Sequence, residues 1–336
     1  MTASSATTVT AVPQSGLDSV ATPHLWAVTV AAVVALLVVD FLITRRPHDV
    51  EMREAVAWSA FYIALPLAFG GYVWWAFGSH RGVEYLTGYL VEKSLSVDNL
   101  FVFMLLLSAF AVPRRLQQRV LLFGIIGALA LRAVFIALGA VALARFEWTF
   151  LVFGAILLYA GVKVLRQAVH DDGPTDVERM PTVRWVRRLL PVSGEYHGTR
   201  VVVRVGGRRA LTPLALVVVA VLVTDVMFAV DSVPAVYGIT GDPYLVFVTN
   251  AFALLGLRAL YFVLQGALGR LAHLGYGLAA ILGFIGVKLV LHWSHLRWEG
   301  VPEIPTSLSL AVIVLVLAIT VVTSLRAERQ VEPTRV

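Results

Sequence analysis

Two similar stretches of this chain, 133 residues apart, each carry a pair of carboxylate side chains. Glu92 and Asp98 lie six residues apart in the first stretch, and Asp225 and Asp231 lie six apart in the second. Both stretches are otherwise apolar and long enough to cross a membrane, where an unpaired acid is costly. Because a cation is the natural partner for such acids, the pattern predicts a cation site built from both stretches.

Further oxygen donors follow the second acid of each pair. Asn99 comes directly after Asp98, and Ser232 directly after Asp231. A set of carboxylate, amide and hydroxyl oxygens suits Mg²⁺, Ca²⁺ or Mn²⁺ and argues against Cu(I) or Zn²⁺. Met227 lies four residues before Asp231 on the same helix face. Its thioether would favour Mn²⁺ over Ca²⁺, although a methionine in a membrane helix usually has a packing role.

The position of each acid in its span suggests its role. Asp98 lies about 18 Å along its helix, close to the middle of the membrane, where Asp231 is expected to meet it. Glu92 and Asp225 are then expected nearer the outer and inner mouths, as gating or proton-exchange sites. Six residues turn a helix by about 600°, so either the helix unwinds between the acids or each acid has its own partner. Pro234 favours a break in the second stretch.

Buried basic residues offer a structural alternative for the same acids. Arg132, Arg258, Lys163 and Lys288 could each pair with an acid and simply fix helix packing. For the two arginines we expect a mixed role, in which they hold the acids when no cation is bound. The lysines either reach the interface with their long side chains or act as titratable groups. Asn250 is expected to have a partner, because amides buried in lipid usually do.

The composition places these residues in a membrane. Apolar residues make up 59% of the chain and charged residues 14%, with a mean hydropathy of +0.82, which indicates a polytopic membrane protein. There is no cysteine, so disulfides, iron–sulfur clusters and thiolate metal sites are excluded. No nucleotide-binding motif or catalytic triad is present, so we expect neither an enzyme nor a permanently bound cofactor.

Hydropathy predicts an all-α fold with about nine transmembrane helices. Basic residues gather in the loops on one side, which predicts an outer N-terminus and a cytoplasmic C-terminus. This asymmetry explains the isoelectric point of 9.8 without a nucleic-acid partner. Asp40, near the end of the first span, is expected to be an interfacial charge. The predicted spans are residues 24–43, 57–77, 86–110, 118–143, 147–165, 211–237, 243–265, 271–291 and 306–325.

The repetition extends from the acids to three whole spans. Leu131-Arg132-Ala133 recurs as Leu257-Arg258-Ala259, and Gly161-Val-Lys163 recurs as Gly286-Val-Lys288. Since three is odd, the copies cross the membrane in opposite directions, which is the inverted repeat of many secondary transporters. The predicted organisation is an outer tail (1–23), a transport domain (24–325) with repeats 86–165 and 211–291, a cytoplasmic loop (166–210) and a cytoplasmic tail (326–336).

These motifs resemble the TerC/Alx family of integral membrane proteins over roughly residues 24–325. The resemblance rests on Leu-Ser-Val-Asp98-Asn99-Leu-Phe, Thr224-Asp225-Val-Met-Phe-Ala-Val-Asp231-Ser232-Val-Pro and Leu-Gly-Leu-Arg258-Ala-Leu-Tyr-Phe. It implies a place in the bacterial cytoplasmic membrane and a relation to LysE-type exporters, with links to tellurite resistance and Mn²⁺ export. Many members carry an acid three residues before the position of Asp225, where this chain has Leu222.

The sequence therefore favours a secondary transporter that exports divalent cations, Mn²⁺ first among them, in exchange for protons. The resemblance implies that Glu92, Asp98, Asn99, Asp225, Asp231 and Ser232 form the ion pathway. Two alternatives stay open. One is a Ca²⁺/H⁺ exchanger; the other is a membrane scaffold or assembly factor whose basic loop 166–210 binds cytoplasmic or membrane proteins.

Overall fold

The computed structural model describes residues 19–44, 51–110, 112–170, 202–205, 208–265, 273–298 and 300–331. Most of the predicted outer tail and most of the predicted cytoplasmic loop lie outside these residues. The described chain is a bundle of helices with one β-hairpin, in which β1 (Val202–Val205) pairs antiparallel with β2 (Arg208–Leu211). The helices are α1 (Pro23–Thr44), α2 (Met52–Ala109), α3 (Arg114–Arg145), α4 (Thr149–His170), α6 (Pro213–Tyr237), α7 (Pro243–Leu255), α8 (Leu257–Gln265), α9 (Leu274–His295) and α10 (Thr306–Val331).

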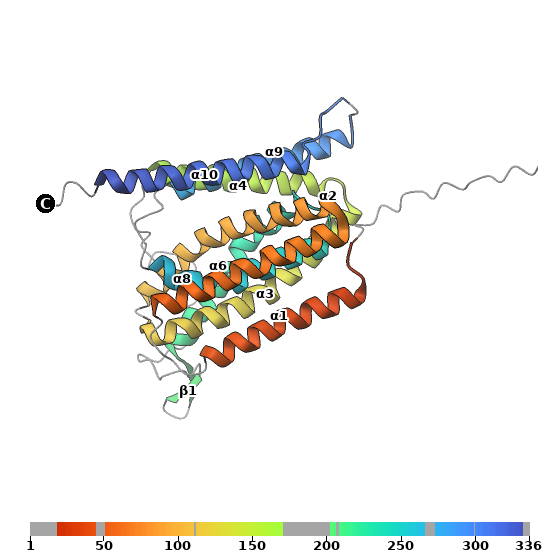
Figure 1. Ribbon diagram of the computed structural model, residues 1–336. Helices are drawn as coiled ribbons and strands as arrows, with labels where there is room; N and C mark the ends of the chain where they lie inside the picture. Colours follow the sequence, from red (N-terminus) through yellow and green to blue (C-terminus); the bar gives the residue numbers. More distant parts are fainter. Residues whose placement is uncertain are drawn as a thin grey trace, which may run out of the picture.

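Helix α2 is folded back on itself at one glycine. Gly78 has φ 85° and ψ 170°, a conformation that glycine adopts readily and that other residues avoid. Its two limbs, residues 52–77 and 79–109, contain the predicted spans 57–77 and 86–110 and meet at a turn on the right of Figure 1. The glycine thus separates two predicted spans without a loop between them.

The prediction of an all-α polytopic membrane protein is confirmed. Six helices of the described chain are long and apolar enough to cross a membrane, and a seventh if α7 and α8 together form one span. The two limbs of α2 are not among them, so the count of nine stays a prediction. The outermost helices α1 and α10 turn apolar faces outward, as expected for surfaces in contact with lipid.

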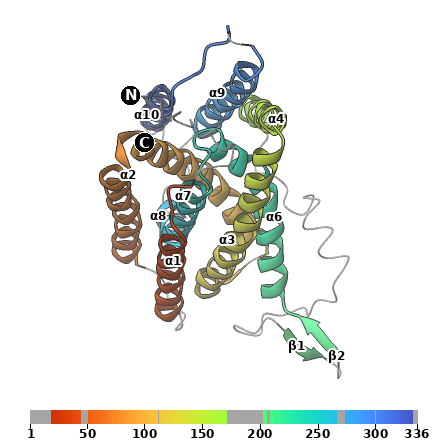
Figure 2. The same ribbon diagram turned by 90° about the vertical axis from the view of Figure 1, so that its right-hand side faces the viewer.

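Helix packing follows the pattern that the predicted repeat would produce. Helix α4 packs along α9, while α3 packs on α6 and α2 packs on α7 and α8. Exchanging the two predicted copies would turn the contact of α3 with α6 into the contact of α2 with α7 and α8. It would leave the contact of α4 with α9 unchanged. Figures 1 and 2 show α4, α9 and α10 together on one side of the bundle. The repeat itself stays a prediction.

The predicted break lies in a different span from the one that proline suggested. Helix α6 continues through Pro234 and ends three residues later, at Tyr237, so the proline lies in the last turn and does not break the helix. The predicted span 243–265 is the broken one: α7 and α8 meet at Gly256 with a bend of 41°. Every residue from Tyr244 to Leu255 is buried, so this broken span runs through the core of the bundle.

The contact between α4 and α9 yields a first prediction. A Cβ atom on Gly286 would lie 3.0 Å from Leu158 Cγ and 3.1 Å from the Gly154 carbonyl oxygen, whereas a Cβ on Gly283 of the same helix would meet nothing within 4 Å. We expect Gly286→Val to lower the free energy of unfolding by about 1–3 kcal/mol through overpacking. Gly283→Val is the matched control and carries the same change in helix propensity. Equal losses in chemical unfolding of the two variants in detergent would contradict this packing.

Candidate functional site

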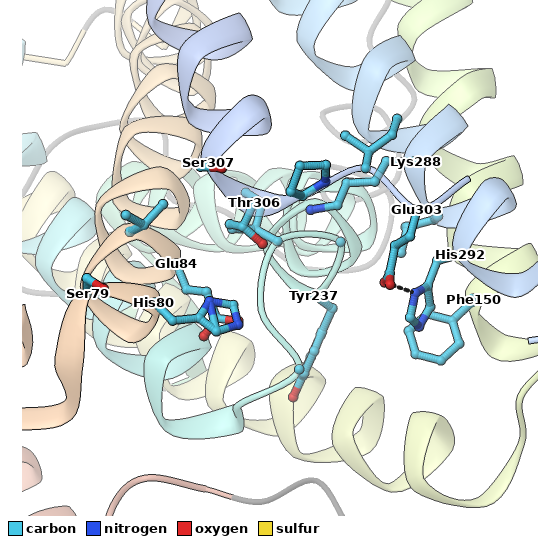
Figure 3. Close-up of a pocket in the computed structure, with 17 residues that line it drawn as sticks. Ser79, His80, Glu84, Phe150, Tyr237, Lys288, His292, Glu303, Thr306 and Ser307 are labelled. Atoms are coloured by element: carbon cyan, nitrogen blue, oxygen red, sulfur yellow. Dashed lines mark hydrogen bonds and ion pairs between the residues drawn. The ribbon is translucent and has the colours of Figure 1, made fainter. Parts of the chain in front are cut away.

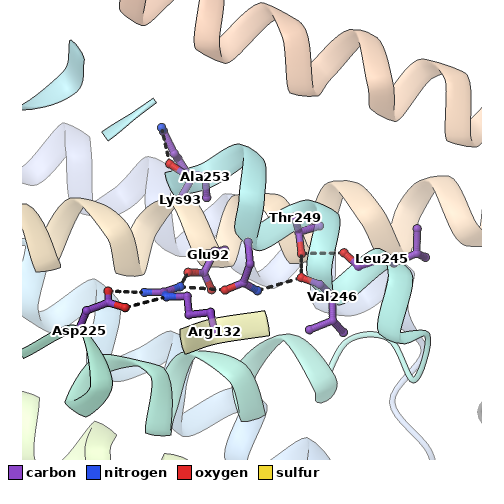
Figure 4. Close-up of polar contacts among 9 residues, drawn as sticks. Glu92, Lys93, Arg132, Asp225, Leu245, Val246, Thr249 and Ala253 are labelled. Carbon is purple, nitrogen blue, oxygen red and sulfur yellow. Dashed lines mark hydrogen bonds and ion pairs between the residues drawn. The ribbon is translucent and has the colours of Figure 1, made fainter. Parts of the chain in front are cut away.

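Arg132 lies at the centre of a buried charged cluster. Its side chain, on α3, is fully buried and donates to Glu92 of α2 and to both carboxylate oxygens of Asp225 on α6. The distances to Asp225 are 3.5 Å from Nε to Oδ2 and 3.3 Å from Nη2 to Oδ1. Arg132 Nη1 also donates to Asn250 Oδ1 on α7 at 2.8 Å. Figure 4 shows the guanidinium between the two acids.

Helical periodicity brings these side chains into the interior. On α6, Asp225 lies on the same buried stripe as Ala229 and Ser232, at the i, i+4 and i+7 spacing of one helix face. On α3, Arg132 continues the buried stripe of Ala128 and Ile136. The apolar neighbours on each stripe pack into the core. Arg132 and Asp225 are therefore buried because they lie on the same helix faces as these neighbours.

The charges of this cluster do not balance. One guanidinium faces two carboxylates, and Glu92 Oε2 is buried without a hydrogen-bond partner among the described residues. Asn250 adds a neutral acceptor, and its own amide donates to the Val246 carbonyl at 2.9 Å, which fixes its orientation. A buried acid with a free oxygen carries a desolvation cost that a proton or a cation would relieve.

The cluster changes the roles predicted for two acids. Glu92 and Asp225 occupy equivalent positions in the predicted repeats, and we expected them near opposite mouths. They instead share one arginine. The expectation failed because it placed each acid by its depth in the span and ignored the reach of a long arginine side chain. The structure places Arg132 against both acids and Asn250 against Arg132, which are contacts of the kind that the sequence led us to expect.

The second acid of each pair lies on a regular helix. Residues 92–98 of α2 form regular helix, so the helix does not unwind between Glu92 and Asp98. Asp231 is half-buried on α6, Asn99 is buried on α2, and the buried Ser232 hydroxyl has no hydrogen-bond partner among the described residues. The side chain of Asp98 lies outside the described part, so its meeting with Asp231 stays a prediction.

The other supporting residues have different surroundings. Arg258 pairs with Asp40 of α1, a buried acid rather than the interfacial charge expected. Lys163 is exposed on α4. Met227 is 56% exposed, because two residues turn it about 200° away from Asp225 around α6. It therefore gives no support to a thioether ligand in this conformation.

Lys288 lines a cavity of about 680 Å³ at the end of the bundle that carries the Gly78 turn and the connection between α9 and α10. At its wall Glu84 accepts from Thr240 at 3.1 Å and from Arg81 at 2.8 Å, while His292 lies 2.8 Å from Glu303. Figure 3 shows the side chains around this cavity. Glu84 and Glu92 are two turns apart on α2, about 12 Å along its axis, so the cavity approaches the Arg132 cluster from one side.

Sequence reasoning missed three contributors. Lys93 directly follows Glu92 and donates to the Ala253 carbonyl at 3.4 Å; its place inside the repeated motif was the available signal. Asp40, the partner of Arg258, and Tyr62, which hydrogen-bonds to Asp40, lie outside the predicted repeats, and nothing in their own spans points to Arg258. Among the described residues no three His, Asp or Glu side chains are grouped to hold a metal ion.

Comparison with known proteins agrees with the membrane architecture. The sequence model of the Integral membrane protein TerC family matches residues 77–332. A Myxococcus xanthus protein named uncharacterized membrane protein STKORF319 is 41% identical over 312 residues, covering 93% of this chain and 95% of its own length. A Salmonella typhi protein named putative membrane-bound redox modulator Alx is 41% identical over 317 residues (91% and 95%). Its Escherichia coli K12 namesake is 40% identical over 315 residues (90% and 95%). No solved structure matches.

The unequal charges of the cluster yield a second prediction. Arg132→Met leaves two carboxylates buried without a counter-charge, so we expect it to lower the free energy of unfolding by about 3–5 kcal/mol. Adding Glu92→Gln and Asp225→Asn to this variant removes both uncompensated charges and should recover most of the loss.

Chemical unfolding in detergent measures both effects. The matched control is Arg145→Met at the exposed end of α3, which should stay within about 0.5 kcal/mol of the wild type. A triple variant no more stable than Arg132→Met would show that the acids do not depend on Arg132 for compensation.

Proposed function

This chain belongs to the TerC family of integral membrane proteins, and on that premise we propose that it is a secondary transporter exporting divalent cations. The observation that carries the proposal is the cluster of Glu92, Asp225 and Arg132, in which acids from both predicted repeats share one arginine. Inverted-repeat transporters bind their substrates at the interface of the repeats, near the middle of the membrane. In the predicted repeat pattern the cluster would lie at this interface, because Glu92 belongs to the first copy and Asp225 to the second.

The guanidinium acts in this proposal as an internal counter-ion. With no metal bound, Arg132 neutralises one of the two carboxylate charges. A divalent cation entering between Glu92 and Asp225 supplies two positive charges and displaces Arg132, so the cluster carries one excess negative charge without the ion and none with it. Carboxylate and amide oxygens from Glu92, Asp225 and Asn250 are ligands that hard divalent ions accept. Asp98, Asn99, Asp231 and Ser232 extend this donor set as proposed ligands.

The donor atoms of the site do not choose among the hard divalent ions. The oxygen donors suit Mg²⁺, Ca²⁺ and Mn²⁺ alike, and the exposed Met227 does not separate them. We place Mn²⁺ first because of the links to Mn²⁺ export that the family resemblance implies. Ca²⁺/H⁺ exchange is the alternative within the same transport mechanism.

Export needs an energy source. An inside-negative potential of 100 mV opposes the exit of a divalent cation by about 4.6 kcal/mol, so passive flow cannot expel it. Inward protons are the simplest driving ion, and the Glu92 oxygen without a partner is a place where a proton could bind. We propose the bacterial cytoplasmic membrane as the location, with the N-terminus outside and the C-terminus in the cytoplasm, from the distribution of basic residues.

The printed name of several relatives describes them as putative membrane-bound redox modulators. This chain has no cysteine, so thiol–disulfide exchange by its own side chains is not available to it. Control of a redox-active metal ion's concentration is a way in which a cysteine-free transporter would affect redox balance. The name and the transport proposal are therefore compatible.

Flux measurements test the proposal. Purified protein in liposomes with an imposed pH gradient should move Mn²⁺, and Glu92→Gln and Asp225→Asn should each reduce the flux at least tenfold, because each removes a carboxylate from the cluster. Asp98→Asn and Asp231→Asn are expected to do the same. Competition by Mg²⁺ and Ca²⁺ ranks the ions.

Asp242→Asn provides the control. Asp242 is also buried, but its oxygens accept from backbone amides remote from the cluster, Tyr244 N at 2.9 Å and Val20 N at 2.7 Å, and asparagine keeps the cap of α7. Its flux should equal that of the wild type. Flux that is absent from the wild type, or is unaffected by all four substitutions of acids, would contradict transport and favour the scaffold hypothesis, which removal of residues 171–200 would then test.

A further inference from the structure

Helix α8 is a short helix joined to the core by a break. It contains nine residues, Leu257–Gln265, and bends by 41° from α7 at Gly256. It lies at the end of the bundle with β1 and the last turns of α10, opposite the connection between α9 and α10 that borders the large cavity (Figure 1). The large cavity therefore lies at one end of the bundle and α8 at the other.

One ion pair fastens α8 to the periphery of the bundle. Arg258 donates to Asp40 of α1, and both side chains are buried. Tyr62 of α2 also hydrogen-bonds to Asp40. Arg258 Nε has no hydrogen-bond partner among the described residues, so the guanidinium is held on one side only. A buried pair that is only partly satisfied is less stable than a fully bonded one, which makes it suitable for breaking and re-forming.

A second basic residue supports the break itself. Lys93 of α2 donates its Nζ to the Ala253 carbonyl, four residues before the first residue of α8. That carbonyl would accept from the Leu257 amide in an unbroken helix. A Cβ atom on Gly256 would lie 2.9 Å from Lys93 Nζ and 3.1 Å from Tyr62 Cβ, so only glycine fits there without displacing these neighbours. Lys93 thus stabilises the bent form of the span.

The same span reaches the charged cluster. Asn250 on α7, six residues before the break, binds Arg132 through its side-chain oxygen. One continuous, buried helix, α7, therefore connects the contact at Arg132 with the break at Gly256. Three contacts therefore hold this span. Asn250 is bound to Arg132 in the middle of the span, and the Ala253 carbonyl is bound to Lys93 just before the break. Beyond the break, Arg258 is bound to Asp40.

From these contacts we propose that α8 is the gate of the ion path at the end of the bundle opposite the cavity, and that Asp40 of α1 is its latch. The gate is closed when Asp40 holds Arg258 and opens by rotation of α8 about Gly256. Lys93 and Asp40 are positioning residues, because they act on the helix and not on the transported ion. The proposal rests on the transport function, to which it adds a mechanism of access.

The absence of cysteine allows a direct test of gate opening. Ala259 is buried on α8 beside Arg258, and Ala259→Cys provides a single reporter thiol. We expect slow reaction with a water-soluble maleimide while Asp40 is present, and at least tenfold faster reaction in Asp40→Asn. Asp242→Asn, at the far end of the same broken span, is the matched control and should leave the rate within twofold.

A second variant separates gate opening from loss of folding. Asp40→Asn combined with Arg258→Gln leaves no uncompensated charge, so it should remain folded by gel filtration and still label fast. Slow labelling in both variants with folding intact would overturn the latch. Mn²⁺ flux of the unlabelled wild type is measured on the same preparation: no flux would refute transport whatever the labelling rates, whereas flux with slow labelling in both variants would refute the latch alone.

Discussion

Arg132 carries a positive charge at a place where the surrounding helices are almost entirely apolar. Such a charge is tolerated only if acids meet it, and the acids must come from other helices. Glu92 brings α2, Asp225 brings α6, and Asn250 brings α7 to the same point on α3. The register of these four helices is therefore constrained by one guanidinium, since a shift of any helix by one residue would turn its polar side chain away. Apolar packing alone provides no comparable constraint within a membrane.

The same interaction leaves the cluster one positive charge short. A fully neutral set would be a permanent structural element, and it would have little affinity for anything further. Two acids on one arginine, with one carboxylate oxygen lacking a partner, give a site that is folded without a ligand but still attracts positive charge. In the proposed mechanism, Arg132 would stabilise the fold in the absence of the ion and would compete with the ion for the acids. That competition would weaken binding and so favour release of the ion.

How far the sequence predicts this arrangement differs from residue to residue. The acids, Arg132 and Asn250 could be identified because polar residues are conspicuous within apolar spans, and hydrophobic periodicity alone turns their faces inward. The expected separation of Glu92 and Asp225 was wrong because depth along a helix says nothing about which side chains reach across to one another. Pro234 suggested a break in α6, but α6 is continuous there. The observed break is at Gly256, where no proline is present. The partner of Arg258 was not predictable from the repeat, since Asp40 belongs to a helix outside both copies.

That difference between Arg132 and Arg258 bears on how the protein would work. The two arginines occupy equivalent positions in the predicted repeats, yet one holds the central acids and the other holds a peripheral acid. In an inverted-repeat transporter the two copies exchange conformations as the site opens first to one side and then to the other. For this chain such an exchange would withdraw Arg132 from the centre and release Arg258 from Asp40. A cation that displaces Arg132 would then favour the state in which α8 is free to move. Ion binding and gate opening would be linked because equivalent residues in the two copies cannot both keep their present partners.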